Sequence, residues 1–510
     1  MTTQLYFFRL GDDRSFQLLG AKNLLAGHGI TVNQVFANDL SHQVFQPIVG
    51  WPPGYSVLVA ILALITRDVT FAAIIFDLIS VFLLVFFSRK ILKLLGCSNL
   101  VTNCFTLVTG FFLFDFSQGA APDINAVAFF IVALFMTLLY IRGDKKSVGF
   151  LLILILINFI PPFLRYMFIP VAVIIPLYLI VSGFFLKDRR IMKGGFLILL
   201  ITSLLLAGLL VFQTNYTGAA TYVNPAAKGW FPANLREFYP VVVSSFVQMT
   251  FIYSVSTNFG FTYGEFSTVV WILSTAAAFV LLYLAVKLFI SKRFRNISLR
   301  EHFIYLGAIS SVVIVALLVS LSLRYAALPR TIRSWTYVQE SRYMAFIMIF
   351  LQMLAFLLIF NNWNKMRNGQ WKYVGVFLIV LLSLQTLHGL YFTSKVVASD
   401  KTHFHPDKNY LAKKELIKEL ISKYKTDPGR NLVFASNEKT YVNMANLYGA
   451  NALYNYDPGK KIVSAKPFTL VLILTNTYSG PFTALLKTGE TMPIKTIGNL
   501  SFYEYRSDRQ

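Results

Sequence analysis

The chain has little charge and almost no cysteine for its length. Of its 510 residues only 14% are charged and two are cysteines, whereas 56% are hydrophobic. Soluble proteins have about 25% charged residues, so this composition excludes an ordinary soluble protein of that size. Several apolar runs approach or exceed the ~20 residues that a helix needs to cross a bilayer. The sequence therefore predicts an α-helical polytopic membrane protein.

The scarcity of cysteine also limits redox and metal chemistry. Cys97 and Cys104 lie close together in the sequence. On one helix they are separated by a rise of about 10 Å, which is too far for a disulfide. No CxxC motif is present, so we interpret both as small hydrophobic side chains.

Ten apolar segments are predicted to span the membrane. An eleventh, 54–66, is too short and is interpreted as an in-plane or re-entrant helix. The predicted spans are 69–88, 100–116, 122–141, 148–164, 166–186, 195–213, 266–290, 303–323, 343–360 and 373–394.

Basic residues alternate between the connectors of these spans. Five short connectors have 18 of them, whereas the opposite set has seven: Arg165, Lys228, Arg236, Arg324, Arg330, Arg333 and Arg342. Cytoplasmic loops are rich in Lys and Arg, which places the first set in the cytoplasm and both chain ends outside. The connectors explain most of the net charge of +23, so no nucleic-acid partner is expected.

Three regions follow from this topology. Residues 1–68 form an external first loop with interfacial helices, residues 69–394 the transmembrane domain, and residues 395–510 a soluble external α/β domain. In the last region the patterns predict an amphipathic helix closed by Pro428-Gly429 and two buried strands, 431–436 and 468–475. They also predict a helix ending at Gly449 and a hairpin turning at Gly498-Asn499.

The first loop opens on two adjacent acids, Asp12 and Asp13, in "GDDRSFQLLGAKNLLAGHG". An acid at a helix N-terminus is favoured by capping and by the helix dipole. Capping needs only one acid, and Gly27 and Gly29 suit the end of the same helix. The second acid is therefore a candidate for catalysis or metal binding, although a capped interfacial helix would also explain the segment.

Other ionisable residues lie at or within the apolar runs, where they are costly in lipid and usually face the protein interior or a cavity. The topology places Asp123, Arg165 and Arg342 at the external face, as it does Asp115 and the two first-loop acids. Arginine binds phosphate through its planar guanidinium, and a carboxylate can deprotonate a hydroxyl. Asp77 lies in the middle of a span and is interpreted as a buried structural group.

These residues resemble the GT-C superfamily of integral-membrane glycosyltransferases, above all the bacterial relatives of protein O-mannosyltransferases and of the lipid A aminoarabinose transferase. The similar features are the acid pair, "AKNLLAGHG", and Pro52-Pro53-Gly54-Tyr55, followed by "APDINAVAFF", "FLRYMFIPVAVIIPLYLI" and "ESRYMAFIMIFLQ". The resemblance covers residues 10–395, and the C-terminal domain is similar to the variable external domains of such enzymes. Family members have a spanning helix before the acid pair, and "LYFFRLG" is similar to the end of one.

The resemblance implies transfer of a sugar from a polyprenyl-phosphate donor to an acceptor hydroxyl, outside the bacterial inner membrane. It assigns the general base, or a ligand of a divalent cation, to Asp12 or Asp13. It assigns donor-phosphate binding to Arg342 with Tyr343 and to Arg165. Asp123, Pro52, Pro53 and Tyr55 become auxiliary residues of the site.

Two other functions fit a polytopic chain of this kind. A transporter or lipid flippase of cell-envelope biogenesis would line its path with intramembrane charges, but the paired inverted repeats common in transporters are not found here. A non-catalytic assembly or sensor protein could be built around the external domain. The acid pair and the proline motif of the first loop favour the enzyme. Neither the sugar, the acceptor nor a need for metal follows from the sequence.

Overall fold

A computed structural model describes most of the chain, and its contacts divide it into two units. One comprises Met1–Phe76 with Ser394–Gln510, and the other comprises Asp77–Thr393. The predicted span 266–290 and Arg342 lie outside the described residues. The described residues are 10, 12–117, 122–143, 147–219, 297–325, 343, 345–361, 410–424, 429–436, 438–454, 462–475, 493–507 and single helical positions between 372 and 390.

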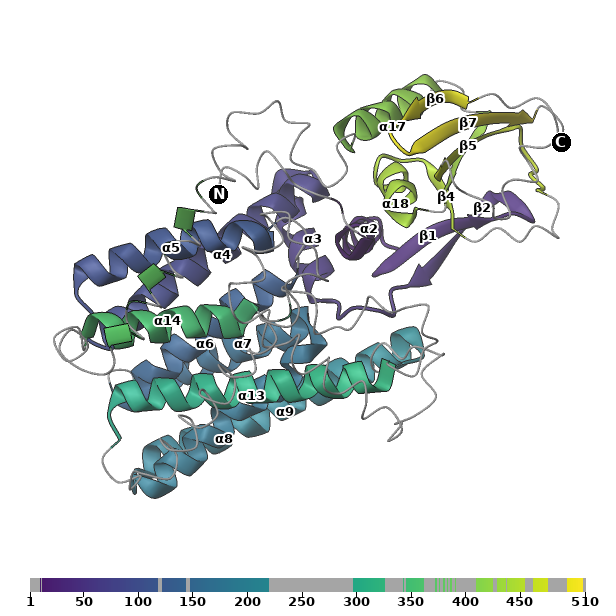
Figure 1. Ribbon diagram of the computed structural model, residues 1–510. Helices are drawn as coiled ribbons and strands as arrows, with labels where there is room; N and C mark the ends of the chain where they lie inside the picture. The colour runs from purple at the N-terminus through teal and green to yellow at the C-terminus, as the bar shows by residue number, and fades with distance from the viewer. Residues whose placement is uncertain are drawn as a thin grey trace. The chain divides into compact units, whose positions relative to one another are not determined.

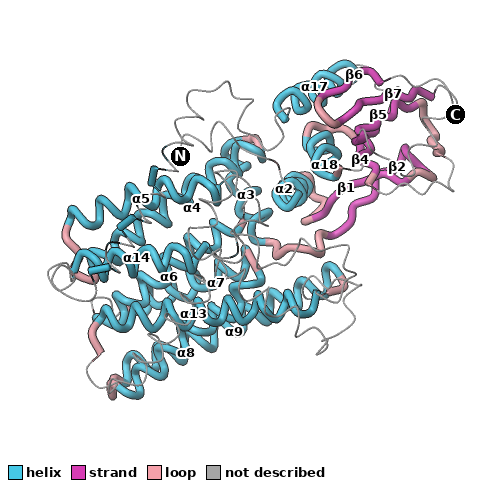
Figure 2. The backbone as a smooth tube through the Cα atoms, in the orientation of Figure 1, coloured by secondary structure: helices cyan, strands magenta, loops and turns pink. Residues whose placement is uncertain are grey.

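The second unit is helical (Figures 1 and 2), as the composition predicts. Among the described residues, five helices are long and apolar enough to cross a membrane: Val69–Leu94, Asp123–Arg142, Tyr166–Phe185, Arg189–Thr217 and Leu299–Leu317. The elements are α4 (Val69–Leu94), which enters this unit at Asp77, and α5 (Asn99–Ser117), α6 (Asp123–Arg142), α7 (Val148–Leu164), η1 (Tyr166–Phe168), α8 (Ile169–Phe185), α9 (Arg189–Thr217), α13 (Leu299–Tyr325) and α14 (Ala345–Asn361).

Two helices extend past their predicted ends into basic sequence. Helix α4 continues through Arg89, Lys90 and Lys93, and α9 begins at Arg189, six residues before the predicted start. A prediction from hydropathy ends the span at the first charged residue. Lys and Arg are nevertheless good helix formers, and their long aliphatic stems can remain beside apolar surface. The basic residues counted as connectors are therefore partly the end turns of helices.

Helices α8 and α9 pack through glycine. A Cβ added at Gly195 of α9 would lie 2.8 Å from the backbone nitrogen of Ile180 on α8, and one added at Gly183 would lie 2.5 Å from the backbone nitrogen of Met192. Small residues allow membrane helices to approach closely, where van der Waals packing and not the hydrophobic effect holds them together. Gly208, also on α9, has nothing within 4 Å of such a Cβ.

This difference makes the two glycines a matched pair for a stability measurement. We expect Gly195→Ala to destabilise the protein by about 1–3 kcal/mol, because backbone must move to admit the methyl group. Gly208→Ala should be neutral or stabilising by up to about 1 kcal/mol, because alanine favours the helix. Thermal unfolding of both variants in the same nanodiscs checks this, and equal effects would contradict the close packing at Gly195.

The first unit contains a five-stranded sheet in the order β4-β3-β5-β7-β6. Strand β3 is parallel to β4 and β5, while β7 is antiparallel to both β5 and β6. The two predicted buried strands and the hairpin at Gly498-Asn499 are confirmed. The strands are β3 (Asn431–Ser436), β4 (Asn451–Leu453), β5 (Phe468–Thr475), β6 (Pro493–Ile497) and β7 (Leu500–Ser507).

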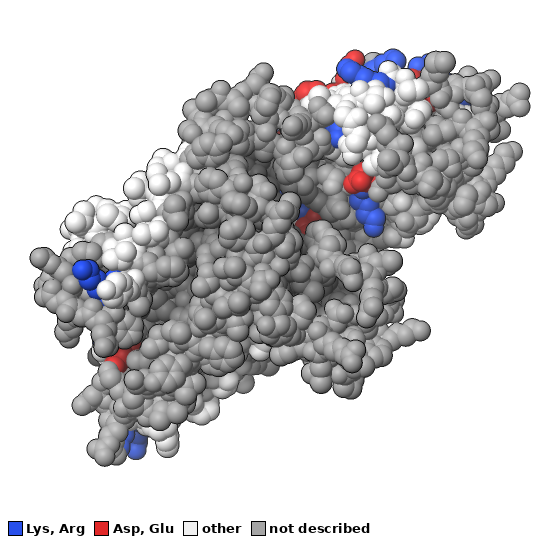
Figure 3. All heavy atoms as spheres, in the orientation of Figure 1, with Lys and Arg blue, Asp and Glu red and all other residues white. Residues whose placement is uncertain are grey.

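Two helices accompany this sheet, α17 (Tyr410–Tyr424) and α18 (Lys439–Leu447). Helix α17 is the predicted amphipathic helix: Leu416, Ile417 and Leu420 are buried, and basic side chains gather over it in Figure 3. Helix α18 is followed by Gly449, whose φ of +100° is the left-handed conformation that favours glycine. Both helices thus follow from local sequence.

The sequence does not predict the hairpin of β1 (Thr31–Phe36) and β2 (Asp39–Pro47) in the first loop. Val35 and Leu40 of this hairpin are buried in one core with Val433, Leu453 and Leu470 of the C-terminal sheet. The backbone N–H of Leu40 also donates to Val463, 2.9 Å away. The two ends of the sequence therefore form one folded unit.

Helices α2 (Asp12–Leu25) and α3 (Gly54–Thr66) complete this unit. Helix α2 is buried for most of its length, and Gly27 after it has a φ of +83°. Helix α3 buries one face, whereas Leu64 and Ile65 are 70% and 80% exposed. An apolar exposed face of this kind suits the in-plane position predicted for α3 in the membrane interface.

Candidate functional site

The first predicted site residue, Asp123, opens helix α6. It follows Pro122 at the helix N-cap, and its side chain is completely buried. A carboxylate is favoured in the first helical turn, where unpaired N–H groups give the helix a partial positive charge. Burial of a charge is costly unless it is paired, so Asp123 needs a cation close by.

Arg165 lies where the chain breaks between α7 and α8. Pro161 and Pro162 occupy the last turn of α7, where proline removes N–H donors and ends a helix. Arg165 is extended, with φ −148° and ψ 122°, and its backbone N–H donates to the carbonyl of Pro161 at 2.8 Å. Helix α7 thus ends directly after the double proline, and Arg165 is its extended C-cap residue.

Asp123 and Arg165 form a bidentate ion pair. Nε of Arg165 donates to Oδ1 of Asp123 at 2.6 Å, and Nη2 donates to Oδ2 at 2.8 Å. The arginine is 8% exposed, so both charges are nearly dry. The guanidinium carbon also lies 5.7 Å from the ring centroid of Tyr343, just before α14. Three residues that the sequence assigns to the site are therefore brought together from three distant segments.

Aromatic packing supports this cluster from within the helical unit. Phe130 of α6 packs edge-on against Phe346 of α14, with ring centroids 4.7 Å apart, and lies 6.0 Å from Phe168 of η1. Tyr166, next to Arg165 in the chain, has a buried hydroxyl that makes no hydrogen bond within the described part of the chain. The cluster thus combines a rigid apolar support with a polar group that lacks a protein partner there.

A second polar cluster is attached to the same turn of α6. Nδ2 of Asn125 donates to Oδ1 of Asp77 at 3.0 Å and to Oγ of Ser80 at 2.9 Å, and all three side chains are buried. The interpretation of Asp77 as a buried structural group agrees with these contacts. Sequence reasoning missed Asn125, although its place two residues after Asp123 in "PDIN" was a usable signal.

In the other unit, the first-loop acids stand at the start of α2. Asp13 is half-buried, and its carbonyl accepts a hydrogen bond from Nε2 of Gln17 at 3.3 Å. The side chain of Asp12 lies outside the described residues. The predicted helix therefore begins at Asp12, and capping by either acid stays a prediction.

The Pro-Pro-Gly-Tyr motif supports α2 from the neighbouring helix. Pro52 and Pro53 are buried, and Pro53 is the residue from which α3 begins. Tyr55 is fully buried, with its ring 5.7 Å from that of Phe76. Oγ of Ser56 donates to the carbonyl of Gln17 at 2.8 Å, which ties α3 to α2.

The metal question raised by the family resemblance rests on the acid pair. In the described ranges, no three His, Cys, Asp or Glu side chains gather as a metal-binding group. A divalent cation at Asp12 and Asp13 stays a prediction.

Comparison with known proteins gives structural likeness alone. No family model matches the chain, and no curated protein sequence matches it. The chain is similar to a crystal structure of ArnT from Cupriavidus metallidurans bound to undecaprenyl phosphate, with 11% identity, a TM-score of 0.48, and coverage of 98% of this chain and 94% of that one. It is also similar to apo ArnT from the same organism, with 12% identity, a TM-score of 0.47, and coverage of 97% and 93%. ArnT is an aminoarabinose transferase, the group that the sequence motifs resemble.

Proposed function

We propose that the protein is a membrane glycosyltransferase that moves a sugar from a polyprenyl-phosphate donor to an acceptor hydroxyl on the external face of the bacterial inner membrane. The observation that carries this proposal is the cluster of Asp123, Arg165 and Tyr343 at the ends of apolar helices. Helix ends lie near the lipid headgroups, which is the depth at which a lipid-linked phosphate must be held.

The acid pair supplies the base in this proposal. The carboxylate of Asp12 or Asp13 takes the proton of the acceptor hydroxyl as its oxygen attacks the anomeric carbon of the sugar. A new bond forms between this oxygen and the anomeric carbon, while the bond from the same carbon to the phosphate oxygen breaks. The electron pair leaves with polyprenyl phosphate, so the products are the glycosylated acceptor and the free lipid phosphate.

The arginines hold the negative charge that develops on the leaving phosphate. Arg342 and Tyr343 bind the donor in the proposal, and Arg165 fixes this segment through the ring of Tyr343, 5.7 Å away. A guanidinium has five N–H donors, so pairing with Asp123 and binding to phosphate are compatible roles for Arg165. Charge-assisted hydrogen bonds to phosphate are about twice as strong as neutral ones and become stronger in a dry site.

The lipids of a deletion strain test this function. If the protein is the transferase, a polyprenyl-phosphate sugar should accumulate on the external leaflet and disappear when the gene is restored, as measured by mass spectrometry with and without a membrane-impermeant oxidant. Accumulation on the cytoplasmic leaflet would instead indicate a flippase, the alternative function. Unchanged lipid-linked sugars would overturn both.

A further inference from the structure

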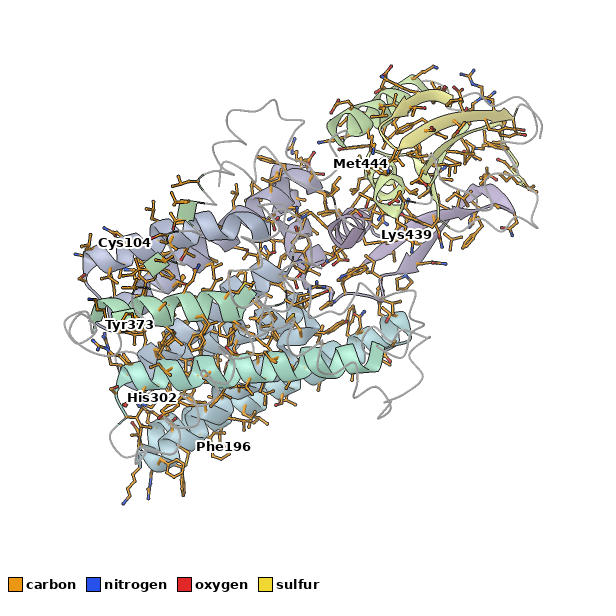
Figure 4. The ribbon with its side chains drawn as sticks, viewed as in Figure 1. Cys104, Phe196, His302, Tyr373, Lys439 and Met444 are labelled. Atoms are coloured by element: carbon orange, nitrogen blue, oxygen red, sulfur yellow. The ribbon has the colours of Figure 1, made fainter. Side chains whose placement is uncertain are left out.

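Helix α18 of the C-terminal region lies directly against α2, the helix that begins with the acid pair. Figure 1 shows the two helices side by side, and Figure 4 labels Lys439 and Met444 on α18. Nδ2 of Asn443 on α18 donates to Oγ of Ser15 on α2 at 2.7 Å, and both side chains are completely buried. This hydrogen bond joins two residues that are 428 positions apart in the sequence. Ser15, its acceptor, lies two residues after Asp13.

The backbone of α18 holds the far end of α2. Nζ of Lys22, in the last turns of α2, donates to the backbone carbonyl of Asn446 at 2.6 Å. Nδ2 of Asn446 donates to the carbonyl of Asn33 in β1, 2.8 Å away. Ser15 and Lys22 are about 10 Å apart along a helix, so α18 fixes α2 at two separated points and restrains its rotation.

Asn443 is itself fixed from its other side. The hydroxyl of Tyr454 donates to Oδ1 of Asn443, and burial raises the pKa of Tyr454 further above its usual range. The Tyr454 ring lies 6.0 Å from Phe16, which in turn stacks on Trp51 at 5.7 Å. Both ends of the Asn443 amide are thus engaged, which leaves it one orientation relative to Ser15.

We propose that Asn443 is a positioning residue for the first-loop acids, with the α18 backbone at Asn446 as a second support, so that the C-terminal region is part of the transferase site. This inference rests on the proposed function, because it assigns the base to Asp12 or Asp13. Helix α2 is short, and its start follows the orientation of the buried turn at Ser15. Loss of the Asn443 contact would remove a buried hydrogen bond between α18 and α2 and allow that turn to shift.

The test compares Asn443→Leu with Lys439→Ala, an exposed position on the same helix. Asn443→Leu should lower kcat by about 100-fold with the donor KM unchanged, because a shift of about 1 Å at a catalytic group has an effect of that size. Hydrogen exchange of residues 12–25 should become faster in Asn443→Leu and remain unchanged in Lys439→Ala. If Asn443→Leu does not fold, Ser15→Ala removes the same hydrogen bond from the other partner and should behave in the same way.

The acid variants separate this inference from the proposed function. When Asn443→Leu is combined with the more damaging of Asp12→Asn and Asp13→Asn, kcat should fall no further, because the residue acts through the acid. The positioning role would be overturned if Asn443→Leu lowered kcat in the acid variant as much as it does in the unchanged protein. Unchanged hydrogen exchange in α2 of Asn443→Leu would overturn it as well. If neither acid variant loses activity, the proposed base is wrong, whereas the exchange measurement still decides whether α18 holds α2.

Discussion

Asparagine in place of the catalytic acid should lower kcat by about 10²–10⁴-fold, the usual contribution of a positioned general base. We expect this for Asp12→Asn or Asp13→Asn and not equally for both, because one acid serves the helix N-terminus and the other the reaction. Asparagine has nearly the shape of aspartate and is a good cap, so the helix should remain. The measurement is transfer of sugar from a polyprenyl-phosphate donor by protein reconstituted in nanodiscs.

Asp39→Asn is the matched control for this experiment. Asp39 lies in the same folded unit but is exposed, and its hydrogen bonds to Ser41 hold the pKa of its carboxyl below the usual range. It is therefore an ionised acid without a proposed catalytic role, and its replacement should leave kcat unchanged. Full activity of both first-loop variants would remove the acid pair from the mechanism.

Hydropathy and local signals predicted those parts of the fold that depend on neighbouring residues. The segment 148–164 became α7 at both its ends, in spite of Pro161 and Pro162, because prolines in the last turn mark a boundary and not an interruption. The hairpin turn at Gly498 was also predicted from local sequence, and its φ of +63° is a conformation that favours glycine. The ends of α4 and α9 were missed because a basic residue ends a hydropathy window without ending a helix.

Pairings between distant residues could not be predicted. Asp123 and Arg165 were each singled out as costly charges in an apolar run, but a single sequence does not show that they neutralise one another. The hairpin of β1 and β2 was missed because its residues are buried by strands about 400 positions later. Asn443 and Asn446 gave no signal, since asparagine in a polar helix is ordinary until its partners are known.

The ion pair of Asp123 and Arg165 provides the prediction with the largest effect on stability. Removal of one partner, in Asp123→Leu or Arg165→Met, leaves a buried charge without compensation and should destabilise the protein by about 3–5 kcal/mol. The double variant removes both charges and should recover most of this loss, because a well-packed apolar pair often replaces a buried ion pair without cost. Thermal unfolding of the three variants in nanodiscs measures the coupling.

An exposed ion pair gives the control. Lys418 and Glu415 are 3.3 Å apart with side chains 42% and 66% exposed, so Glu415→Gln should change stability by less than about 1 kcal/mol. If Asp123→Leu has an effect as small as this, the buried pair does not contribute as its geometry indicates.

Activity of the double variant then separates structure from function. A pair that only holds helices α6 and α7 together can be replaced by apolar side chains with stability and transfer both recovered. A pair that places Tyr343 and the neighbouring Arg342 at the donor phosphate cannot be replaced in this way. Arg165→Met removes the guanidinium that lies beside the Tyr343 ring. We therefore expect the double variant to be folded but impaired, with a raised donor KM. Recovery of normal KM would restrict the pair to a structural role and leave the phosphate to Arg342 alone.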